Sequence, residues 1–481
     1  MHTHKASGPL YVRVASQIES QIRDGVLRAG EKLPSIRYLS EQRGVSISTA
    51  LQAYLWLESG GWIEARTRSG FYVRRKEAAA VPEPDPAARP AETPADLGQA
   101  KLLMELIETA RGPINVSFGC AFPDPSFLPA KKMSAILGRA ARISPLLAAE
   151  YQLPPGYEPL RRQIARRSPE FGCNFTHNNL VITNGAMEAV HLSLRAVAKA
   201  GDVIAVESPI YYGAMEAIDS LGMRMIEIPT HPRQGIDLNV LEDAIRKHGV
   251  KACFAMTNVH NPLGFVLETD RKRELAALAA RYQVPVIEDD VYGDFVFGTG
   301  GRTTAKQFDR EGLVLYCGSV SKSLGGGYRM GWLEPGRFRK TVERLQFTST
   351  IGAPSLQQIA LADLLASGGY ERHVRKLRSA FERNMAIFRE AIARYFPAGT
   401  RMTRPAGGFV LWVQLPGRAS ALALYEAARA QGISVLPGDA FSPGNQYPDY
   451  IRMNCGYNWS DTYDAAVRTL GRLCAGLPRV T

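Results

Sequence analysis

The sequence predicts a protein of two folded parts, a small helical head that ends in a β-hairpin and a larger α/β body. Three observations predict this fold class. Apolar residues recur at helical spacing over the first 60 residues and are followed by two short β-like runs. A proline-rich stretch, 77–97, separates this region from the remainder. From about residue 112, strand-like runs alternate with helical stretches, which is typical of α/β folds.

The composition bounds the class of protein. At 481 residues the chain exceeds the size at which one hydrophobic core keeps growing. The net charge is +12, and residues 1–76 hold 12 Lys and Arg against 6 Asp and Glu. This excess favours contacts with nucleic-acid phosphates, with solubility alone as the alternative. Six scattered cysteines predict reduced thiols and no metal site. Without a signal-like or membrane-spanning apolar run, we expect a cytoplasmic protein that is nucleoid-associated when bound to DNA.

Three helices and a hairpin are predicted in the head. The first helix runs from Pro9 to about residue 25, and Ser35 can cap a second helix that ends near Gly44. Ser46 begins a third helix that ends at residues 60–61. The β-like runs 62–64 and 71–73 are joined by a basic turn with Arg66, Arg68 and Gly70. Together these elements predict a winged helix-turn-helix, whose third helix would enter the major groove while the wing touches the DNA backbone or the minor groove.

Motifs in the head resemble the GntR family of bacterial regulators. The matching residues are 9–11, 30–37, 44–46 with Thr49, 53–54 with Leu57, and 69–73. The DNA contacts that the resemblance implies are Ser35, Arg37, Ser46, Ser48, Thr49 and Tyr54. Ile47 departs from the family pattern, which often has arginine there. Because isoleucine cannot make a bidentate guanine contact, we expect it to contact a thymine methyl. A winged helix that binds protein is the alternative.

The stretch 77–97 contains five prolines among alanines and acidic residues. Such a composition cannot build a core, so we expect an extended and mobile linker with a reach of at most roughly 60 Å. The leucine and isoleucine spacing of residues 98–111 predicts a short helix. The predicted division is therefore a head over 1–76, a linker over 77–97 and a body over 98–481.

Chemically informative residues follow the predicted strands of the body, 179–183, 202–207, 252–257, 284–288 and 313–317. Ligands collect at such strand ends in open parallel sheets. Lys322, in Ser319-Val320-Ser321-Lys322, could hold pyridoxal phosphate as a Schiff base. Asp289 would keep the ring nitrogen protonated, Asn261 and Tyr292 would hold the phenolic oxygen, and Tyr211 would stack on the ring. Each of these residues alone usually has a structural explanation, but the ordered set predicts the cofactor.

A phosphate site is predicted at the turn that begins at Thr183. The turn can open a helix whose free N–H groups bind an anion, with Gly185, Ala186 and Met187 at its start. Ser319, Ser321 and Arg329 would add hydroxyl and guanidinium donors.

Residues 112–478 resemble the fold-type I aminotransferases. Further matches are Gly119 with 122–124, 151–156, 407–409 with Trp412, and 451–453. The resemblance implies a mostly parallel sheet in a large part, about 112–350, and a smaller C-terminal α/β part, about 351–481 with the segment near 112–130. Gly119 and Arg452 would bind the substrate, Arg452 through its α-carboxylate, with a surface salt bridge as the alternative. Tyr151 would reach the neighbour's phosphate across a dimer interface. Ala186 and Met187 depart from the hydroxyl and amide common in relatives, which predicts a lower cofactor affinity.

Head, linker and body together resemble the MocR subfamily of bacterial regulators. This resemblance implies a homodimer that binds double-stranded operator DNA and senses a small amino acid or amine through pyridoxal phosphate. Two alternatives stay open. The protein could be an active aminotransferase that converts amino acids to 2-oxo acids and also binds DNA, although we expect any such activity to be weak or vestigial. Pyridoxal phosphate itself could also be the effector.

Overall fold

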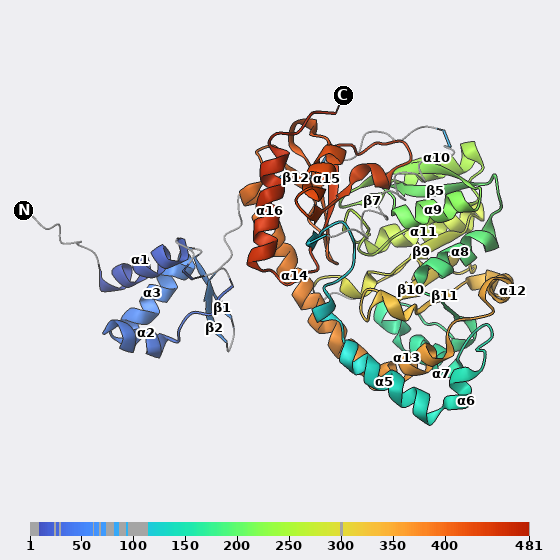
Figure 1. Ribbon diagram of the computed structural model, residues 1–481, viewed down its shortest axis with the longest axis horizontal. Coiled ribbons are helices and arrows are strands. Elements are labelled where there is room, and N and C mark those ends of the chain that lie inside the picture. Colours follow the sequence, from blue (N-terminus) through green and yellow to red (C-terminus); the bar gives the residue numbers. More distant parts are fainter. Residues whose placement is uncertain are drawn as a thin grey trace, which may run out of the picture. The chain divides into compact units, whose positions relative to one another are not determined.

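The computed structural model describes residues 9–23, 26–27, 30–60, 62–66, 69–73, 81–85, 93–94, 114–298 and 302–480. The chain forms two compact units, Met1–Ala80 and Val81–Thr481 (Figure 1). Arg68, the predicted helix 98–111 and most of the proline-rich stretch lie outside the described residues.

The head has the predicted winged helix-turn-helix elements. They are α1 (Leu10–Arg23), α2 (Ile36–Arg43), α3 (Ile47–Ser59) and the antiparallel strands β1 (Ile63–Arg66) and β2 (Gly70–Val73). Ser35 Oγ accepts the Tyr38 N–H at 3.2 Å, and Ser46 Oγ accepts the Thr49 N–H at 3.1 Å. Gly44 ends α2 in the left-handed region. Both predicted helix starts and this predicted helix end are therefore confirmed.

Among the described residues the body has a main sheet of eight strands, in the order β4-β11-β10-β9-β8-β5-β6-β7. β7 and β11 run antiparallel to their neighbours, and the other strands are parallel to one another. The strands are β4 (Val181–Thr183), β5 (Val203–Ser208), β6 (Arg224–His231), β7 (Gly235–Ile236), β8 (Ala252–Ala255), β9 (Val286–Asp289), β10 (Val314–Ser319) and β11 (Gly331–Glu334).

Helices cover both faces of this sheet because successive strand residues point to opposite sides. In β5, Ile204 and Val206 belong to the hydrophobic cluster that includes α8 and α9, whereas Val203 and Ala205 belong to the one that includes α10 and α11. These helices are α8 (Ala186–Val197), α9 (Tyr212–Ser220), α10 (Leu238–His248) and α11 (Thr269–Tyr282). The central strand β5 is therefore buried on both faces, as is usual in parallel sheets.

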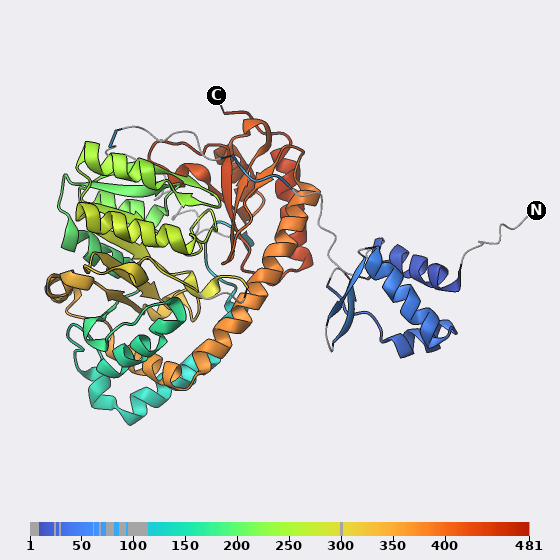
Figure 2. The same cartoon turned by 180° about the vertical axis from the view of Figure 1, so that it is seen from behind.

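A further helical group packs beside the sheet (Figures 1 and 2). Its members are α5 (Ala130–Ile143), α6 (Pro145–Ala149), α7 (Glu158–Arg167), α13 (Ser355–Ala366) and α14 (Gly369–Tyr395). The helix α12 (Arg339–Thr350) packs against α8 instead. The long helix α14 contacts α13 at this group and α16 in the C-terminal part. Short 3-10 turns are Pro125–Phe127, Ser168–Phe171, His177–Asn179, Gly293–Phe295, Lys306–Phe308, Gly326–Tyr328, Gly336–Phe338, Pro416–Arg418 and Gly438–Phe441.

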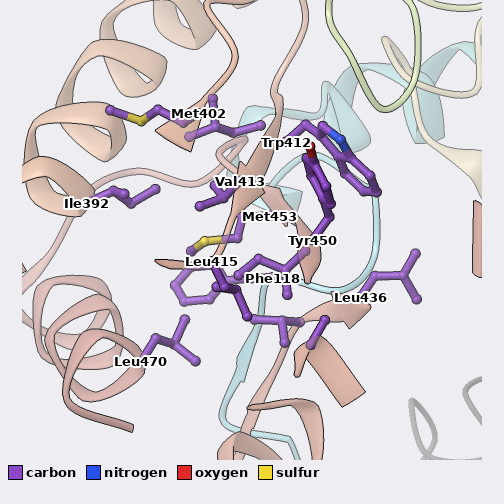
Figure 3. Close-up of a cluster of buried hydrophobic side chains, with 14 of the residues drawn as sticks. Phe118, Ile392, Met402, Trp412, Val413, Leu415, Leu436, Tyr450, Met453 and Leu470 are labelled. Atoms are coloured by element: carbon purple, nitrogen blue, oxygen red, sulfur yellow. The ribbon is translucent and has the colours of Figure 1, made fainter. Parts of the chain in front are cut away.

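The C-terminal part is built on an antiparallel sheet of four described strands, in the order β12-β13-β16-β15. Its elements are β12 (Arg401–Met402), β13 (Val410–Gln414), β15 (Leu436–Pro437), β16 (Tyr450–Asn454), α15 (Ala421–Arg429) and α16 (Asp461–Cys474). Figure 3 shows its apolar core, in which Val413 and Met453 of the sheet lie on the side of Ile392 of α14 and Leu470 of α16. Strand β3 (Val116–Ser117) pairs with β14 (Ile433–Ser434), so the segment near residue 116 joins the C-terminal elements.

The expectation of a freely mobile linker is wrong for residues 81–85. Val81 packs against the apolar core of the C-terminal part, and Pro84 is buried. The Met402 N–H donates to the Pro82 carbonyl at 3.0 Å. The proline-rich composition correctly indicated that this stretch cannot form a hydrophobic core by itself. Residues 81–85 are ordered because they pack against the core of the body.

Candidate functional site

A cavity of about 200 Å³ opens at the carboxyl ends of the parallel strands. The predicted cofactor residues that line it are Ala186, Met187, Tyr211, Asn261, Asp289, Tyr292, Ser321, Lys322 and Arg329. The lining that sequence reasoning missed consists of Phe122, Met256, Val291 and Gly326. The fold thus brings nine predicted residues from five separate segments of the chain to one place.

Lys322 lies just beyond the end of β10 and extends into this cavity. Its Nζ donates to the Ala121 carbonyl at 2.8 Å and lies 4.7 Å from the centre of the Phe122 ring. Burial, with a further contribution from the Arg452 charge, lowers the pKa of Lys322 to about 8. A larger share of the amine is therefore neutral near pH 7 than for an exposed lysine, and only the neutral amine is a nucleophile.

Asp289 ends β9 and is 3% exposed. One of its carboxylate oxygens accepts the Val291 N–H at 3.2 Å. Burial raises the pKa of Asp289 to about 7, although the Lys322 charge opposes this shift. Burial also raises the pKa of Tyr211 and of Tyr292, so both phenols remain protonated hydrogen-bond donors.

The turn after β4 leads directly into α8. Gly185 has φ +80°, and a Cβ there would lie 2.5 Å from Arg329 Nη2, so this position requires glycine. Arg329 Nη2 donates to the Asn184 carbonyl at 2.7 Å, and Glu188 accepts the Asn184 N–H at 2.6 Å. The side chains of Arg329 and Glu188 therefore hold this turn in place at the start of α8. The first N–H groups of a helix such as α8 have no hydrogen-bond partner within the helix.

Ser319 is placed behind the cavity lining. Its hydroxyl donates to the Met330 carbonyl at 3.0 Å and lies 2.8 Å from Ser321 Oγ, and it accepts the Ser321 N–H at 3.0 Å. It therefore orients Ser321, which itself lines the cavity.

Arg452 lies in the middle of β16 and is 0% exposed, which rules out a surface salt bridge. Its Nη1 donates to Asn261 Oδ1 at 3.3 Å, and its Nη2 donates to the Gly119 carbonyl. Nε has no partner, and none of the described carboxylates forms an ion pair with this guanidinium. A buried charge without a counter-ion is unfavourable, so this position suits an anionic ligand.

In the loop 119–122, sequence reasoning predicted Gly119 as a site residue but missed the role of residues 120–122. Asn454 Nδ2 donates to the Cys120 and Phe122 carbonyls at 2.7 and 2.6 Å and so holds the loop at the cavity. Phe122 is 55% exposed even though it lines the cavity. The motif of Gly119 with residues 122–124 marked this loop in the sequence. Its contact with Lys322 could not be predicted, because the two lie about 200 residues apart in the sequence.

Tyr151 lies outside the cavity and is 76% exposed. It lines a separate hollow of about 550 Å³ together with Asn184, Thr350 and Pro354. Because Asn184 belongs to the turn before α8, this hollow lies next to the predicted phosphate site.

In the head, the predicted DNA-contact residues Ser35, Arg37, Ser46, Ser48 and Gly70 lie at least partly exposed, and Thr49 is half-buried. Ser46 Oγ lies 2.9 Å from Ser48 Oγ and 2.8 Å from Thr49 Oγ1, so these hydroxyls bond to one another at the start of α3. The Arg66 side chain and all of Arg68 lie outside what the structure describes.

Tyr54 is a correction, because its side chain is 0% exposed and cannot contact DNA. The hydroxyl donates to the Pro34 carbonyl at 2.8 Å, and the ring lies 5.0 Å from that of Phe71. Burial raises the pKa of Tyr54 to about 12. The residue holds α3 against the segment before α2, which is a packing role.

An apolar stripe runs along the exposed face of α3, which also carries the exposed polar residues Ser48, Gln52 and Ser59. Ile47, Leu51 and Leu55 are 56%, 38% and 49% exposed. They follow one another at four-residue steps and therefore share one face of the helix.

Two family models match the chain. Residues 10–73 match bacterial regulatory proteins of the gntR family, and residues 140–470 match aminotransferase class I and II. YdcR of Escherichia coli strain K12, described as an uncharacterized HTH-type transcriptional regulator, is 37% identical over 96% of this chain and 98% of its own length. The probable rhizopine catabolism regulatory protein MocR of Rhizobium meliloti is 24% identical over 90% of this chain and 87% of its own.

The chain belongs to the MocR-type transcriptional regulators. Among solved structures, the body of this MocR-type chain is similar to LysN, the alpha-aminoadipate aminotransferase of Thermus thermophilus, complexed with N-(5'-phosphopyridoxyl)-L-leucine. That similarity has a TM-score of 0.72 at 25% identity and covers 79% of this chain and 95% of the other. The predicted fold class, a winged helix-turn-helix joined to a fold-type I aminotransferase domain, is confirmed.

The residues of this MocR-type chain fit pyridoxal phosphate, which the aminotransferase family implies as its cofactor. A lysine with a lowered pKa, a buried carboxyl group and a glycine turn at a helix start surround one cavity. The GntR-type head likewise implies operator binding. None of the described helices is long and apolar enough to cross a membrane.

Proposed function

We propose that the protein is a pyridoxal-phosphate-dependent transcriptional regulator whose body holds the cofactor at Lys322 and detects a small amino acid or amine. When bound, the cofactor supplies an aldehyde that condenses with an amine, with loss of water, to form a Schiff base. The observation that carries the proposal is the cavity in which Lys322, Asp289 and Asn261 meet beside a glycine turn.

Each proposed cofactor contact has a physical basis. Asp289 would be the acid beneath the ring nitrogen, because a cationic nitrogen would compensate its buried carboxylate. Asn261 and Tyr292 would donate to the phenolic oxygen, and Tyr211 would stack on the ring. The phosphate would accept from the N–H groups of residues 185–187, from Ser321 and from Arg329, with Ser319 as a supporting residue. Ala186 and Met187 offer only backbone donors there.

Arg452 would bind the carboxylate of an amino-acid ligand. Its guanidinium is buried, has no anionic partner among the described side chains, and lies beside Asn261 and the Gly119 carbonyl. A carboxylate would supply the missing charge and could accept two parallel hydrogen bonds. A ligand of this kind would also compete for the donors that now hold Gly119 and Asn261.

A homodimer is part of the proposal. Large apolar side chains are exposed on the elements that lead from α5 to the hollow of Tyr151, among them Ile143, Leu146 and Leu153 at 71%, 79% and 51%. Exposed apolar side chains that gather in one region mark protein interfaces. A second copy seated there could bring its own Tyr151 to the phosphate site, since Tyr151 does not line the cavity of its own chain.

On the DNA side, α3 would lie in the major groove, with phosphate contacts from Ser35, Arg37 and the hydroxyls of Ser46, Ser48 and Thr49. Arg66, Arg68 and Gly70 would contact the backbone or the minor groove through the wing. The apolar stripe of Ile47, Leu51 and Leu55 favours readout of thymine methyl groups.

Replacing thymine by uracil, which lacks the methyl group, tests this readout in a selected operator. Each replacement at a contacted thymine should weaken operator binding by the wild-type protein. In a Leu51→Ala variant, the replacement at the thymine that Leu51 contacts should no longer weaken binding.

A visible-absorbance titration tests the body. Purified protein loaded with pyridoxal phosphate is titrated with a panel of amino acids and amines. We expect a cofactor band that shifts with one chemical class, and no such band in Lys322→Ala. The matched control is Lys131→Ala, which removes an exposed lysine. A wild-type protein that retains no cofactor, or whose band no compound changes, would contradict the proposal.

An active aminotransferase that also binds DNA is a second candidate, favoured by the presence of Lys322, Asp289 and Arg452 in one region of the body. The two functions differ in turnover. A sensor stops after binding its ligand, whereas an aminotransferase keeps producing 2-oxo acid while an amino acceptor is supplied. Repeated turnover that Lys322→Ala abolishes would favour the enzyme.

A further inference from the structure

The docked segment 81–85 is held at several points. The Pro82 carbonyl accepts the Met402 N–H at 3.0 Å, and Glu83 Oε1 accepts the Arg404 N–H at 2.9 Å. Met402 belongs to β12, the edge strand of the C-terminal sheet, so the segment occupies an edge that would otherwise have unpaired N–H groups. In Figure 2 it is the blue stretch that lies among the red C-terminal elements.

Two ion pairs add to these bonds. Glu83 pairs with Arg233, and Asp85 Oδ2 lies 2.6 Å from Arg401 Nη1. The Glu83 side chain is 21% exposed and that of Asp85 is 82% exposed. Glu83 is therefore the stronger contact, because solvent screens an exposed pair and Glu83 also accepts a backbone N–H.

The edge that holds this segment belongs to the sheet that carries Arg452. Thr403, which directly precedes Arg404, makes two hydrogen bonds with Trp412. The Thr403 N–H donates to the Trp412 carbonyl at 3.0 Å, and the Thr403 hydroxyl accepts the Trp412 N–H at 3.3 Å. Trp412 lies opposite Arg452 in the pairing of β13 with β16. A single strand, β13, therefore separates the strand of Arg452 from the strand that holds the segment.

A second connection runs through the loop that follows the docking edge. The Ala406 N–H donates to the Gly264 carbonyl at 2.8 Å, and a Cβ at Gly264 would lie 2.5 Å from Pro405 Cβ. The Gly264 N–H donates to the His260 carbonyl at 2.6 Å and so closes a turn that contains Asn261, whose Oδ1 accepts from Arg452. The loop is thus packed against the turn that contacts the buried guanidinium.

The docked segment shortens the stretch of chain between the head and the first contact with the body. The last strand of the head ends at Val73, and only residues 74–80 lie between it and Val81. The stretch from Val73 to Val81 can span at most about 29 Å. Release of residues 81–85 would lengthen this connection by at least these five residues, whose extended length is about 18 Å.

We propose that residues 81–85 are a tether anchor that ties the head to the ligand-binding sheet and limits how far the head can reach. Movement of the sheet that carries Arg452 would then be passed to the head through a short connection. The anchor would also restrict the spacing between two DNA half-sites that the linked heads of a dimer can occupy. The part of this inference that concerns ligand signalling rests on the proposed function.

The test compares full-length wild type with a Glu83→Ala, Asp85→Ala double variant. The control is Asp243→Ala, which removes an exposed ion pair with Arg246 on α10, away from the anchor. Hydrogen exchange is measured at the Met402 and Arg404 amides, with strand β9 as a check that the body is folded. We expect at least tenfold faster exchange at these two amides in the double variant alone. Unchanged exchange would overturn the anchor.

The second measurement is affinity for paired half-sites, selected with the wild-type protein and respaced in single base-pair steps. We expect a narrow spacing preference for wild type and the control, and a broader one for the double variant. Faster exchange without a broader preference would overturn the limit on reach. Neither measurement depends on pyridoxal phosphate, so failure of the proposed sensing function would leave both results interpretable.

Discussion

The cavity of the body and the exposed face of α3 differ in how many of their polar groups already have partners. Arg452 is buried without an anion among the described residues, and burial favours the neutral forms of Asp289 and Lys322. In the head, by contrast, the hydroxyls at the start of α3 bond to one another. The missing partners in the body therefore indicate its ligand chemistry. Under the proposed function these hydroxyls would exchange their internal bonds for DNA contacts, and the exposed apolar side chains of α3 would carry more of the sequence readout.

The largest expected effect is at Arg452. Replacing it by methionine removes the buried cation that bonds to Asn261 and should weaken binding of carboxylated ligands by about 2–5 kcal/mol, which is roughly 30-fold to several thousand-fold. Stability without ligand should not fall, because the variant no longer buries an uncompensated charge. Calorimetry with an amino acid and with its decarboxylated amine measures the difference. Equal losses for both compounds would contradict the carboxylate role.

The next effect concerns the pH dependence of stability in cofactor-free protein. Burial raises the pKa of Asp289 to about 7, so between its ordinary pKa of about 4 and pH 7 the folded chain keeps a proton that the unfolded chain releases. The stability that this carboxyl group contributes is complete at acidic pH and is lost as pH rises through 7. The Asp289→Asn side chain stays neutral at every pH. The free energy of unfolding of this variant should therefore rise by up to about 4 kcal/mol relative to that of wild type across this pH window. Denaturant unfolding at several pH values measures this gain, and parallel profiles for the two proteins would refute it.

At the head, Arg37→Ala should weaken operator binding about equally for all sequences and should lower the slope of log affinity against log salt by about one. The measurement is a salt titration with the selected operator and with unrelated DNA. A loss confined to the operator would instead mean that Arg37 reads a base.

The smallest effect is expected at Tyr54, where the hydroxyl bonds to the Pro34 carbonyl. Tyr54→Phe should destabilise the head by about 1 kcal/mol, because one buried hydrogen bond is lost. Operator affinity measured well below the melting temperature should stay within about twofold of wild type. A large loss of affinity in a fully folded variant would restore Tyr54 as a DNA contact.

The sequence was most informative where the determinants are local. Ser35, Ser46 and Gly44 cap helix ends that lie next to them in the sequence, so their capping roles could be predicted. Lys322 and Asp289 follow buried strands, and the geometry of parallel sheets brings such positions together. The DNA contact predicted for Tyr54 came from the family resemblance alone. The helical spacing of Tyr54 with Ala53 and Leu57 instead predicts the inner side of α3, where the structure places it. The docking of residues 81–85 depends on Arg233 and Arg401, which are distant in the sequence, and on a core that the segment does not itself contain.

The central claim is that cofactor held at Lys322 controls DNA binding, and operator binding tests it most directly. Wild type, Lys322→Ala and Lys131→Ala are compared with and without pyridoxal phosphate, and then with the amino acid or amine that shifts the absorbance band. The account predicts that affinity or footprint changes with these additions in wild type and Lys131→Ala but not in Lys322→Ala. Identical binding by all three proteins under every condition would contradict it.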